Sequence, residues 1–261
     1  MNLHSHKSEL EAKGITKIPA LIDVSKINTA RDQLLELSKS HGVLDGDHWY
    51  KSDLRFGLSK TFRSALNRLT KSERFPQFID EAILNVAQAL VGQEVTPLAP
   101  GQQLLFTLPG TESWFVPTDV WHLDLPRLKD PGIPGVQAFT FLDRVELGGG
   151  GTLVLAGSHH LLNDQGFIRS KDIKKQLMET PYFKWLFDKN RGVISDFRDT
   201  KGVVEGQTLS VMEMTGEPGD VYFMDLRALH TPAPNASDTA RMMLTCRLPK
   251  ADQDIENLFK S

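Results

Sequence analysis

The sequence predicts an α+β fold in which helices come first and a mainly β region follows. Three segments in the first third carry apolar residues three or four positions apart, which indicates helices with one buried face: 25–40, 59–70 and 76–91. Beyond Pro97 the pattern changes, because short apolar runs alternate with turns that contain Gly or Pro. This alternation is typical of a β-sandwich or a β-barrel.

The expected strands are short and are spread over the rest of the chain. Their ranges are 102–108, 120–125, 136–142, 152–155, 208–214, 220–224 and 241–248, with one earlier strand and turn at 15–22. The segment from about 163 to 206 interrupts them, and it contains a predicted helix over 171–187. A long excursion of this kind from a sheet is often a lid or an interface.

The length of the chain limits the number of domains. A chain of 261 residues, 40% of them hydrophobic, is long enough to bury one full core. We therefore expect a single domain over residues 1–261. Within it, about 1–95 are expected to form a helical support, and about 96–250 the β core that carries the insertion.

Charge and cysteine content narrow the class of protein. The formal net charge is -3 and the pI is about 6.2, which gives no attraction to nucleic acid or to anionic membranes. The single cysteine, Cys246, excludes an internal disulfide and fits a reducing compartment. Residues 1–14 are polar and lack the apolar core of a signal peptide, and no later run approaches a membrane span. We expect a cytoplasmic protein whose partner is a small molecule, and the sequence carries no signal for an oligomeric state.

A histidine and a carboxylate two positions apart, His122 and Asp124, are the first candidate metal ligands. Side chains alternate along an extended segment, so both project to the same face. His230 follows another strand-like run, and two histidines with one carboxylate form the facial triad that suits non-haem Fe(II) and leaves positions open. Arg241 comes eleven residues later. A 2-oxoacid on such a metal needs a buried cation for its distal carboxylate, and arginine is the best partner.

Several motifs occur in an order that resembles one enzyme family. They are His122-x-Asp124, Gly149-Gly150, Gly157-Ser158-His159, Gly219-Asp220, His230 and Arg241, preceded by Gly14-Ile15-Thr16-Lys17-Ile18-Pro19. Together they make the chain similar to the phytanoyl-CoA dioxygenase family of Fe(II)/2-oxoglutarate oxygenases over roughly residues 12–248, most weakly in 43–95 and 163–206. The resemblance implies a double-stranded β-helix (a cupin-like jelly roll) with helices packed on one sheet. It also implies Fe(II), 2-oxoglutarate and O2, with ascorbate as the reductant in assays.

The resemblance assigns roles to four residues. His122, Asp124 and His230 are the implied iron ligands, and Arg241 is the implied anchor of 2-oxoglutarate. Halogenating relatives have a small residue at the position of Asp124, which opens a metal position for chloride. Because a carboxylate stands there in this chain, the resemblance implies a hydroxylase rather than a halogenase.

The rest of the cosubstrate site follows the family less closely. By resemblance, Gln102 and Thr107 are expected near the cosubstrate. Some relatives carry a hydroxyl residue two positions after the distal histidine, where this chain has Pro232. We expect a neighbour such as Thr231 or Thr140 to compensate.

Candidate substrate residues come from the predicted strand 241–248. Alternation places Arg241 and Arg247 on one face and the apolar residues Met242, Leu244, Cys246 and Leu248 on the other. A second inward cation is costly without an anion, so Arg247 is expected either to bind a substrate carboxylate or phosphate or to form a salt bridge at the barrel rim. Arg127 is a weaker candidate of the same kind. The residues around the metal motif are expected either to wall the substrate pocket or to belong to the core: Trp114, Phe115, Trp121 and Leu125.

Two glycine-containing segments invite other interpretations. Gly148–Gly151 lacks the Lys-Ser/Thr ending of a phosphate-binding loop and is expected to be a tight turn. Gly157–His160 is expected to be a structural loop, because a Ser beside a His in sequence does not place the two in catalytic geometry. The alternative is that His159 or His160 contacts the substrate.

The expected reaction is the hydroxylation, or another oxidation, of an unactivated C–H bond with release of succinate and CO2. The expected substrate is a small polar or anionic metabolite, such as an amino acid derivative or an intermediate of secondary metabolism. Two other classes stay open. One is a cupin-like metal hydrolase or isomerase with zinc or manganese at the same triad, and the other is a non-catalytic ligand-binding jelly roll.

Overall fold

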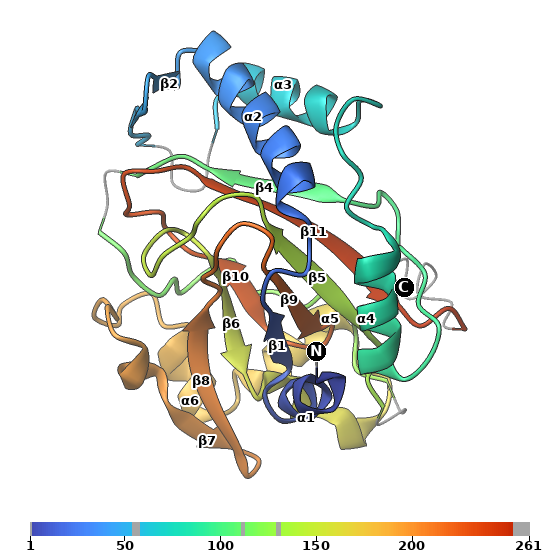
Figure 1. Ribbon diagram of the computed structural model, residues 1–261. Coiled ribbons are helices and arrows are strands. Elements are labelled where there is room, and N and C mark those ends of the chain that lie inside the picture. Colours follow the sequence, from blue (N-terminus) through green and yellow to red (C-terminus); the bar gives the residue numbers. More distant parts are fainter. Residues whose placement is uncertain (1, 54–57, 111–112, 129–131, 253–261) are drawn as a thin grey trace.

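Two antiparallel sheets that face each other form the centre of the computed structural model, which describes residues 2–53, 58–110, 113–128 and 132–252 (Figure 1). The larger sheet has the strand order β1-β9-β5-β11-β4, and the smaller sheet has the order β10-β6-β8-β7. A separate pair joins β2 to β3. The strands are β1 (Ile15–Ile18), β2 (Leu44–Asp45), β3 (His48–Trp49), β4 (Gln103–Thr107), β5 (Gly135–Phe141), β6 (Thr152–Ala156), β7 (Gly202–Val204), β8 (Gln207–Glu213), β9 (Val221–Asp225), β10 (His230–Pro232) and β11 (Arg241–Pro249).

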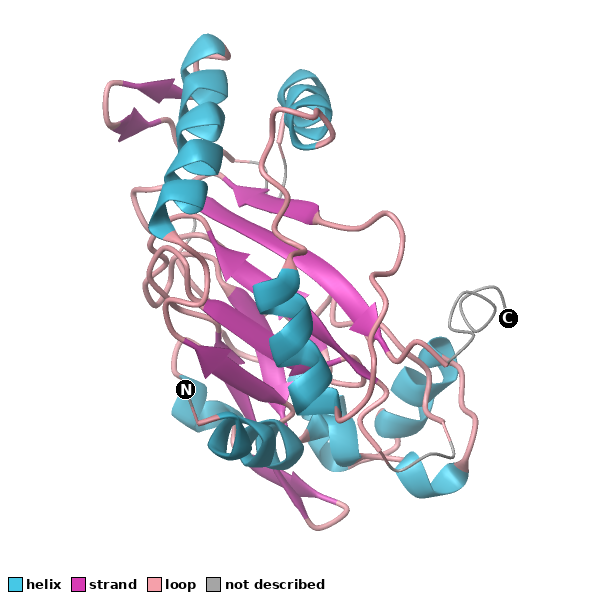
Figure 2. Ribbon diagram, turned by 45° about the vertical axis from the view of Figure 1, so that its right-hand side comes forward, coloured by secondary structure: helices cyan, strands magenta, loops and turns pink. Residues whose placement is uncertain are grey.

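Helices cover the outer faces of both sheets. They are α1 (Leu3–Lys13), α2 (Val24–Ser40), α3 (Lys60–Thr70), α4 (Glu81–Val91), α5 (Ser170–Leu177) and α6 (Pro181–Leu186), with short 3-10 turns η1 (Ser158–His160), η2 (Asn163–Gln165) and η3 (Phe197–Thr200). The first four lie on the side of the larger sheet, and α4 crosses its outer face (Figure 2). Among the described residues, none of the helices combines the length and the apolar character needed to cross a membrane.

The outer face of the larger sheet shares one core with the N-terminal helices. The alternation expected along β11 is confirmed, because its even-numbered side chains enter this core: Met242, Leu244, Cys246 and Leu248. Helices α2, α3 and α4 contribute Leu34, Leu66 and Leu90. The expected helices 25–40, 59–70 and 76–91 therefore form, and the last begins later, at Glu81, after the N-cap Asp80.

A second core fills the space between the two sheets. Phe139, Phe141 and Met243 of the larger sheet meet Val154 and Met214 from the side of the smaller sheet. The odd-numbered side chains of β11 thus point inward, because cross-strand partners in an antiparallel pair lie on the same face. This inner face is where the functional side chains gather.

The insertion forms a third layer. Its buried residues pack on the outer face of the smaller sheet: Ile173, Leu177, Phe183 and Leu186 against Leu153, Leu155, Leu209 and Val211. The insertion therefore covers the smaller sheet on the side away from the inner core, and its apolar face also meets Trp121 and Leu123 of the metal motif.

Three local expectations were wrong. The single helix over 171–187 is two helices, since Pro181 lacks an N–H and occupies the start of α6 behind its N-cap Thr180. Segment 120–125 is no strand: Val120 has a φ of 54°, which breaks the extended run, and only His122 pairs, through an isolated bridge. Helix α1 was not expected, because Leu10 is its one buried residue and it has no apolar stripe.

Candidate metal centre

Three side chains expected to be metal ligands, those of His122, Asp124 and His230, converge in the structure. One ligand atom from each lies within 4.8 Å of the others. The backbone produces this proximity, because His122 N donates to His230 O at 3.0 Å and His230 N donates to His122 O at 3.1 Å. Asp124 reaches the same side, with Oδ2 3.5 Å from His230 Nε2. A single antiparallel bridge therefore assembles ligands from two distant parts of the chain.

The two histidine rings are oriented by backbone carbonyls. His122 Nδ1 lies 3.0 Å from Val120 O, and His230 Nδ1 lies 3.1 Å from Ala228 O. A carbonyl only accepts, so Nδ1 carries the proton and Nε2 keeps its lone pair. Burial lowers the pKa of His230 to about 4 although Asp124 acts in the opposite direction, so this ring is neutral at physiological pH. Two imidazoles with free Nε2 atoms beside a carboxylate form the donor set of a 2-His-1-carboxylate site.

Asp124 divides its two oxygens between different tasks. Oδ1 accepts from Arg247 Nη2 at 2.8 Å, which realises the salt bridge expected as one alternative for Arg247. Oδ2 is buried and has no hydrogen-bond donor. Leaving a buried carboxylate oxygen without a donor or cation is costly. The charge and position of Oδ2 fit a metal ion between it and the two Nε2 atoms.

Arg241 supplies a second polar feature on the inner face. It is buried at the start of β11, where Nη1 donates to Gly150 O at 2.7 Å and Nη2 donates to Thr107 Oγ1 at 2.8 Å. Its Nε is buried without an acceptor. Burial lowers the pKa of Arg241 to about 10, while nearby Glu213 raises it, so the group stays cationic. A buried guanidinium whose hydrogen bonds go only to neutral oxygens suits an incoming carboxylate.

The glycine run lies between Arg241 and Glu213 and is a turn, as expected. Glu213 Oε2 accepts from Gly148 N at 2.9 Å and Oε1 accepts from Gly151 N at 2.8 Å, while Gly150 O faces Arg241. A Cβ at Gly151 would lie 2.1 Å from the carbonyl oxygen of Met214, so no side chain fits there. Burial raises the pKa of Glu213 to about 7, against these N–H donors. The turn therefore binds Glu213 through two backbone N–H groups and Arg241 through the carbonyl of Gly150, and so fixes the two side chains relative to each other.

Comparison with protein families decides the identity. A model of the family described as phytanoyl-CoA dioxygenase (PhyH) matches residues 10–243. The chain belongs to this family. A comparison with curated proteins finds no match.

Solved structures share the fold of this PhyH-family chain. The non-haem α-ketoglutarate-dependent carbocyclase SnoK from nogalamycin biosynthesis is 16% identical, with 95% of this chain and 84% of SnoK covered and a TM-score of 0.56. The corresponding epimerase SnoN is 15% identical, with coverages of 95% and 83% and a TM-score of 0.53. HygX from Streptomyces hygroscopicus, with nickel and 2-oxoglutarate bound, is 14% identical, with coverages of 96% and 88% and a TM-score of 0.52. The implied jelly roll is thereby confirmed.

In this PhyH-family chain, Thr107 supplies the hydroxyl beside Arg241. Thr231 was expected to compensate for Pro232, but it pairs with Leu153, whose side chain faces the insertion. Thr140 pairs with Leu244, whose side chain faces the N-terminal helices. Neither hydroxyl is on the inner face, because side chains alternate along a strand and both residues are at positions that face outward.

Gln102 does not contact the Arg241 site. Its Oε1 accepts from Phe78 N at 2.8 Å and its Nε2 donates to Pro76 O at 3.0 Å, so both ends of the amide bind the segment before α4. The expected role beside the cosubstrate is corrected for this residue, because alternation along β4 turns Gln103 inward instead.

Two polar residues of the inner region were missed by the sequence analysis. Gln137 lies opposite Arg247 in the register of β5 and β11. Glu213 lies beside the glycine turn. The available signal was a polar residue within a predicted strand, but which strands are neighbours was not known from the sequence.

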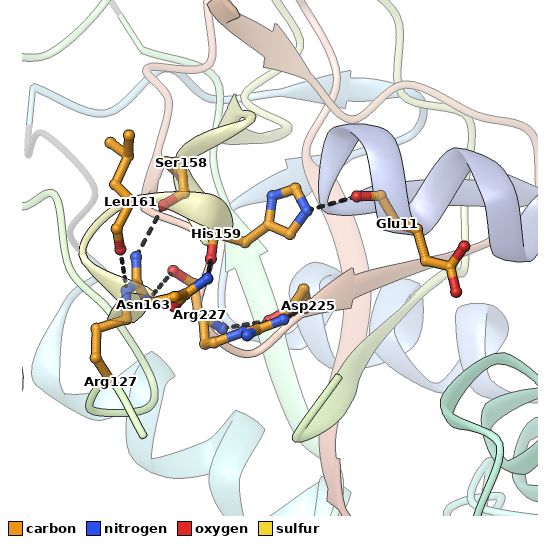
Figure 3. Close-up of polar contacts among 8 residues, drawn as sticks. All are labelled: Glu11, Arg127, Ser158, His159, Leu161, Asn163, Asp225 and Arg227. Carbon is orange, nitrogen blue, oxygen red and sulfur yellow. Dashed lines mark hydrogen bonds and ion pairs between the residues drawn. The ribbon is translucent and has the colours of Figure 1, made fainter. Parts of the chain in front are cut away.

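Arg127 is a structural residue, and its expected role in substrate binding is corrected. Its guanidinium is fully buried and donates to three carbonyl oxygens: Leu161 O at 2.7 Å from Nε, Arg227 O at 2.8 Å from Nη1 and Ser158 O at 2.8 Å from Nη2 (Figure 3). Ser158 Oγ in turn accepts from Leu229 N at 2.9 Å. Arg127 therefore joins the chain that follows Asp124 to the turn that precedes His230.

The neighbours of Arg127 anchor the N-terminal helix. Arg227 and Asp225 form a buried ion pair at 2.8 Å. His159 turns its ring to α1, where Nε2 lies 3.0 Å from Glu11 O (Figure 3). Burial lowers the pKa of His159 to about 4. The loop is structural, as expected, and His159 faces α1.

Trp121 and Trp114 belong to the core below the insertion. Trp121 is buried, donates from Nε1 to Pro117 O at 2.8 Å, and its carbonyl accepts from Lys174 Nζ at 2.6 Å. Trp114 packs edge-on against Phe197 with ring centroids 4.8 Å apart. These contacts favour the alternative that both are core residues over a role as substrate walls.

Proposed function

We propose that this protein is a non-haem Fe(II)- and 2-oxoglutarate-dependent dioxygenase. It oxidises an unactivated C–H bond of a small polar or anionic metabolite, by hydroxylation, and releases succinate and CO2. The observation that carries the proposal is the pairing of the triad with Arg241, a buried cation whose hydrogen bonds go only to neutral oxygens. Membership of the PhyH family supports it.

The metal would be held by His122 Nε2, Asp124 Oδ2 and His230 Nε2. The fit rests on Oδ2, which is buried without a donor, and on the Nδ1 contacts that leave both Nε2 atoms free to bind. Three protein ligands of this kind suit Fe(II) and leave positions for a cosubstrate. Nickel with 2-oxoglutarate is bound by the similar structure HygX.

The distal carboxylate of 2-oxoglutarate would be bound by Arg241. The fit rests on its unpaired Nε and on Thr107 Oγ1, which holds the guanidinium in place. When bound, iron and 2-oxoglutarate supply the oxidising power together with O2. The residues of the chain position the cosubstrate and exclude water, since apolar side chains such as Phe139 and Met243 fill the space between the sheets.

The choice of hydroxylation rests on Asp124, whose carboxylate occupies the position that a halide would need. SnoK and SnoN are a carbocyclase and an epimerase on the same fold. Product analysis by mass spectrometry tests this part of the proposal: an added oxygen atom supports hydroxylation, and a loss of two hydrogens without added oxygen would contradict it.

The proposal is tested by anaerobic absorption spectroscopy. Purified protein with Fe(II) is expected to develop a 2-oxoglutarate-dependent band, which His122→Ala and Arg241→Met weaken or abolish. His4→Ala, in the exposed part of α1, is the matched control. A missing band in the wild type would favour a metal hydrolase or isomerase, or a non-catalytic binding protein, and full succinate formation by His122→Ala would contradict the proposal.

A further inference from the structure

We propose that Arg247 and Gln137 form the substrate-recognition site beside the metal, and that this site binds a small acid that carries an N–H or O–H donor next to its carboxylate. The inference rests on the proposed function, whose site it completes. It also gives Arg247 a second task, because the same side chain orients the metal ligand Asp124.

Arg247 is too far from Arg241 to share its ligand. The two lie on the same face of β11, six residues apart, which corresponds to about 20 Å between their Cα atoms along the strand. A short diacid anchored at Arg241 cannot place the same carboxylate at Arg247. An anionic ligand of Arg247, in addition to Asp124, would therefore not be the carboxylate that Arg241 binds.

The contacts of Arg247 leave binding capacity. Nη2 donates to Asp124 Oδ1 at 2.8 Å, and the side chain is 29% exposed. Nε is buried and has no acceptor. A guanidinium presents five donors, and one contact with Asp124 uses only part of them. A ligand from solvent can contact the exposed part of the side chain, and Nε is a further donor that has no acceptor among the described residues.

Metal binding increases this capacity. Asp124 carries one negative charge, and its Oδ2 lies 3.5 Å from His230 Nε2, where it would bind the metal, while Oδ1 faces Arg247. A divalent ion at Oδ2 would be balanced in part by the single negative charge of Asp124, which in the absence of the ion neutralises Arg247 alone. The surroundings of Asp124 then hold an excess of positive charge, which attracts an anionic substrate group.

Gln137 supplies the complementary acceptor. Thr245 Oγ1 donates its only proton to Ala138 O at 2.9 Å, so it must accept from Gln137 Nε2, which lies 2.9 Å away. This fixes the amide with Oε1 directed away from Thr245, and Oε1 is buried without a donor. Gln137 is the cross-strand partner of Arg247, so the two side chains are neighbours on the inner face.

A donor and an acceptor side by side define the ligand class. Arg247 binds a carboxylate, and Gln137 Oε1 accepts from an amine or hydroxyl on the adjacent carbon. A 2-amino or 2-hydroxy acid has this pattern. A simple amine lacks the anion, and a simple fatty acid lacks the donor.

The experiment uses the full chain with saturating Fe(II) and 2-oxoglutarate under anaerobic conditions. The probes are the proteinogenic L-amino acids and their 2-hydroxy analogues at millimolar concentration. Each is matched with the primary amide, which lacks the carboxylate charge, and with the deaminated acid, which lacks the donor. A substrate near the metal perturbs the 2-oxoglutarate band, and succinate formation is then followed in air.

We expect at least one acid to perturb the band and its amide to fail. Arg247→Met should raise the half-saturating concentration of that acid about tenfold to a hundredfold, and Arg247→Lys less, since charge-assisted hydrogen bonds are lost. Gln137→Leu should weaken the binding of the amino or hydroxy acid but not the binding of the deaminated acid. Arg144→Met, an exposed arginine with exposed partners, is the control for altered charge.

Three results would overturn the inference. They are an amide that binds as well as its acid, an unchanged half-saturating concentration in Arg247→Met, or no response to any probe in the wild type. The band itself reports on the proposed function. If it fails to form in the wild type, the proposed function fails and the inference with it, whereas a normal band without a probe response refutes the inference alone. Unfolding curves of the variants show whether each is folded.

Discussion

Two regions on either side of His230 contain buried or partly buried arginines, and they differ in how completely those arginines are hydrogen-bonded. Arg127 has a carbonyl acceptor for each of its three nitrogens. Arg241 and Arg247 each keep a buried Nε without an acceptor. Burial alone therefore does not distinguish a structural cation from a binding one.

Buried polar groups without hydrogen-bond partners indicate where a ligand binds. A buried polar group without a hydrogen bond costs stability, so most native ones are satisfied. Where the described part of the chain leaves several unsatisfied groups on one face, an exogenous ligand is the simplest explanation. On the inner face these are Asp124 Oδ2, Gln137 Oε1 and the Nε atoms of Arg241 and Arg247.

The largest effect is expected for Arg127→Met. The change would remove the Arg127 donors from three buried carbonyl oxygens, of which Ser158 O keeps a longer contact with Leu161 N at 3.3 Å. The loss should lower the free energy of unfolding by about 3 kcal/mol. Urea unfolding followed by circular dichroism measures it, with Arg144→Met as the exposed control. A stable Arg127→Met protein that has lost 2-oxoglutarate binding would break the comparison.

Arg241→Met should show the opposite pattern. We expect the affinity for 2-oxoglutarate to fall about a hundredfold, because a charge-assisted contact with its carboxylate is lost, while stability changes less than in Arg127→Met. Titration of the anaerobic Fe(II) protein with 2-oxoglutarate gives the affinity. An unchanged affinity would mean that the anchor lies elsewhere.

Arg247→Met should lower the affinity of the protein for the metal rather than its affinity for 2-oxoglutarate. Loss of the contact with Asp124 Oδ1 leaves the carboxylate less well oriented, and removal of such a supporting contact typically lowers metal affinity about tenfold. Competition between the protein and a chelator for Co(II) measures this. If 2-oxoglutarate affinity, measured at saturating metal, falls by the same factor, Arg247 belongs to the cosubstrate site.

The two regions should also respond to pH with opposite signs. Burial raises the pKa of Glu213, beside Arg241, from 4.5 to about 7, so the folded state binds a proton that the unfolded state has lost. Its contribution to the free energy of unfolding should therefore decrease as pH rises from 4.5 through 7, by about 1 kcal/mol between pH 6 and pH 7. Asp225, beside Arg127, has a pKa lowered by Arg227 against the effect of burial, so its contribution is present above pH 3.8 and is lost on acidification.

Unfolding curves from pH 5 to pH 8 measure the effect of Glu213. The wild type should lose stability with rising pH over this window, and Glu213→Gln should flatten the slope. Asp23→Asn is the control, since Asp23 is an exposed helix cap. The same slope in Glu213→Gln and the wild type would assign the dependence to another group.

The sequence predicts best what depends on local pattern. The spacing of His122 and Asp124 and the alternation around Arg241 are properties of neighbouring residues, and the structure brings these groups to one face. The helices with apolar stripes were predicted for the same reason. By contrast, α1 buries one side chain and gives no periodic signal.

What the sequence does not reveal depends on distant contacts. Arg127 and Arg247 were both candidate substrate residues in the sequence, but their acceptors come from segments far along the chain. Thr107 and Thr140 are equally polar, but only the pairing of β4 with β11 places the first beside Arg241. Strand neighbours and register must be known before such residues can be separated.

The bridge between His122 and His230 has a consequence for folding. These residues are more than a hundred positions apart in sequence, and in this stretch two backbone hydrogen bonds hold them together. A metal bound by both rings would add its binding free energy to the free energy of unfolding, because the unfolded chain has no preformed site for it. Metal loading should then slow amide hydrogen exchange at His122 and His230 more than in the strands of the larger sheet, so that the ion completes the fold as well as the site.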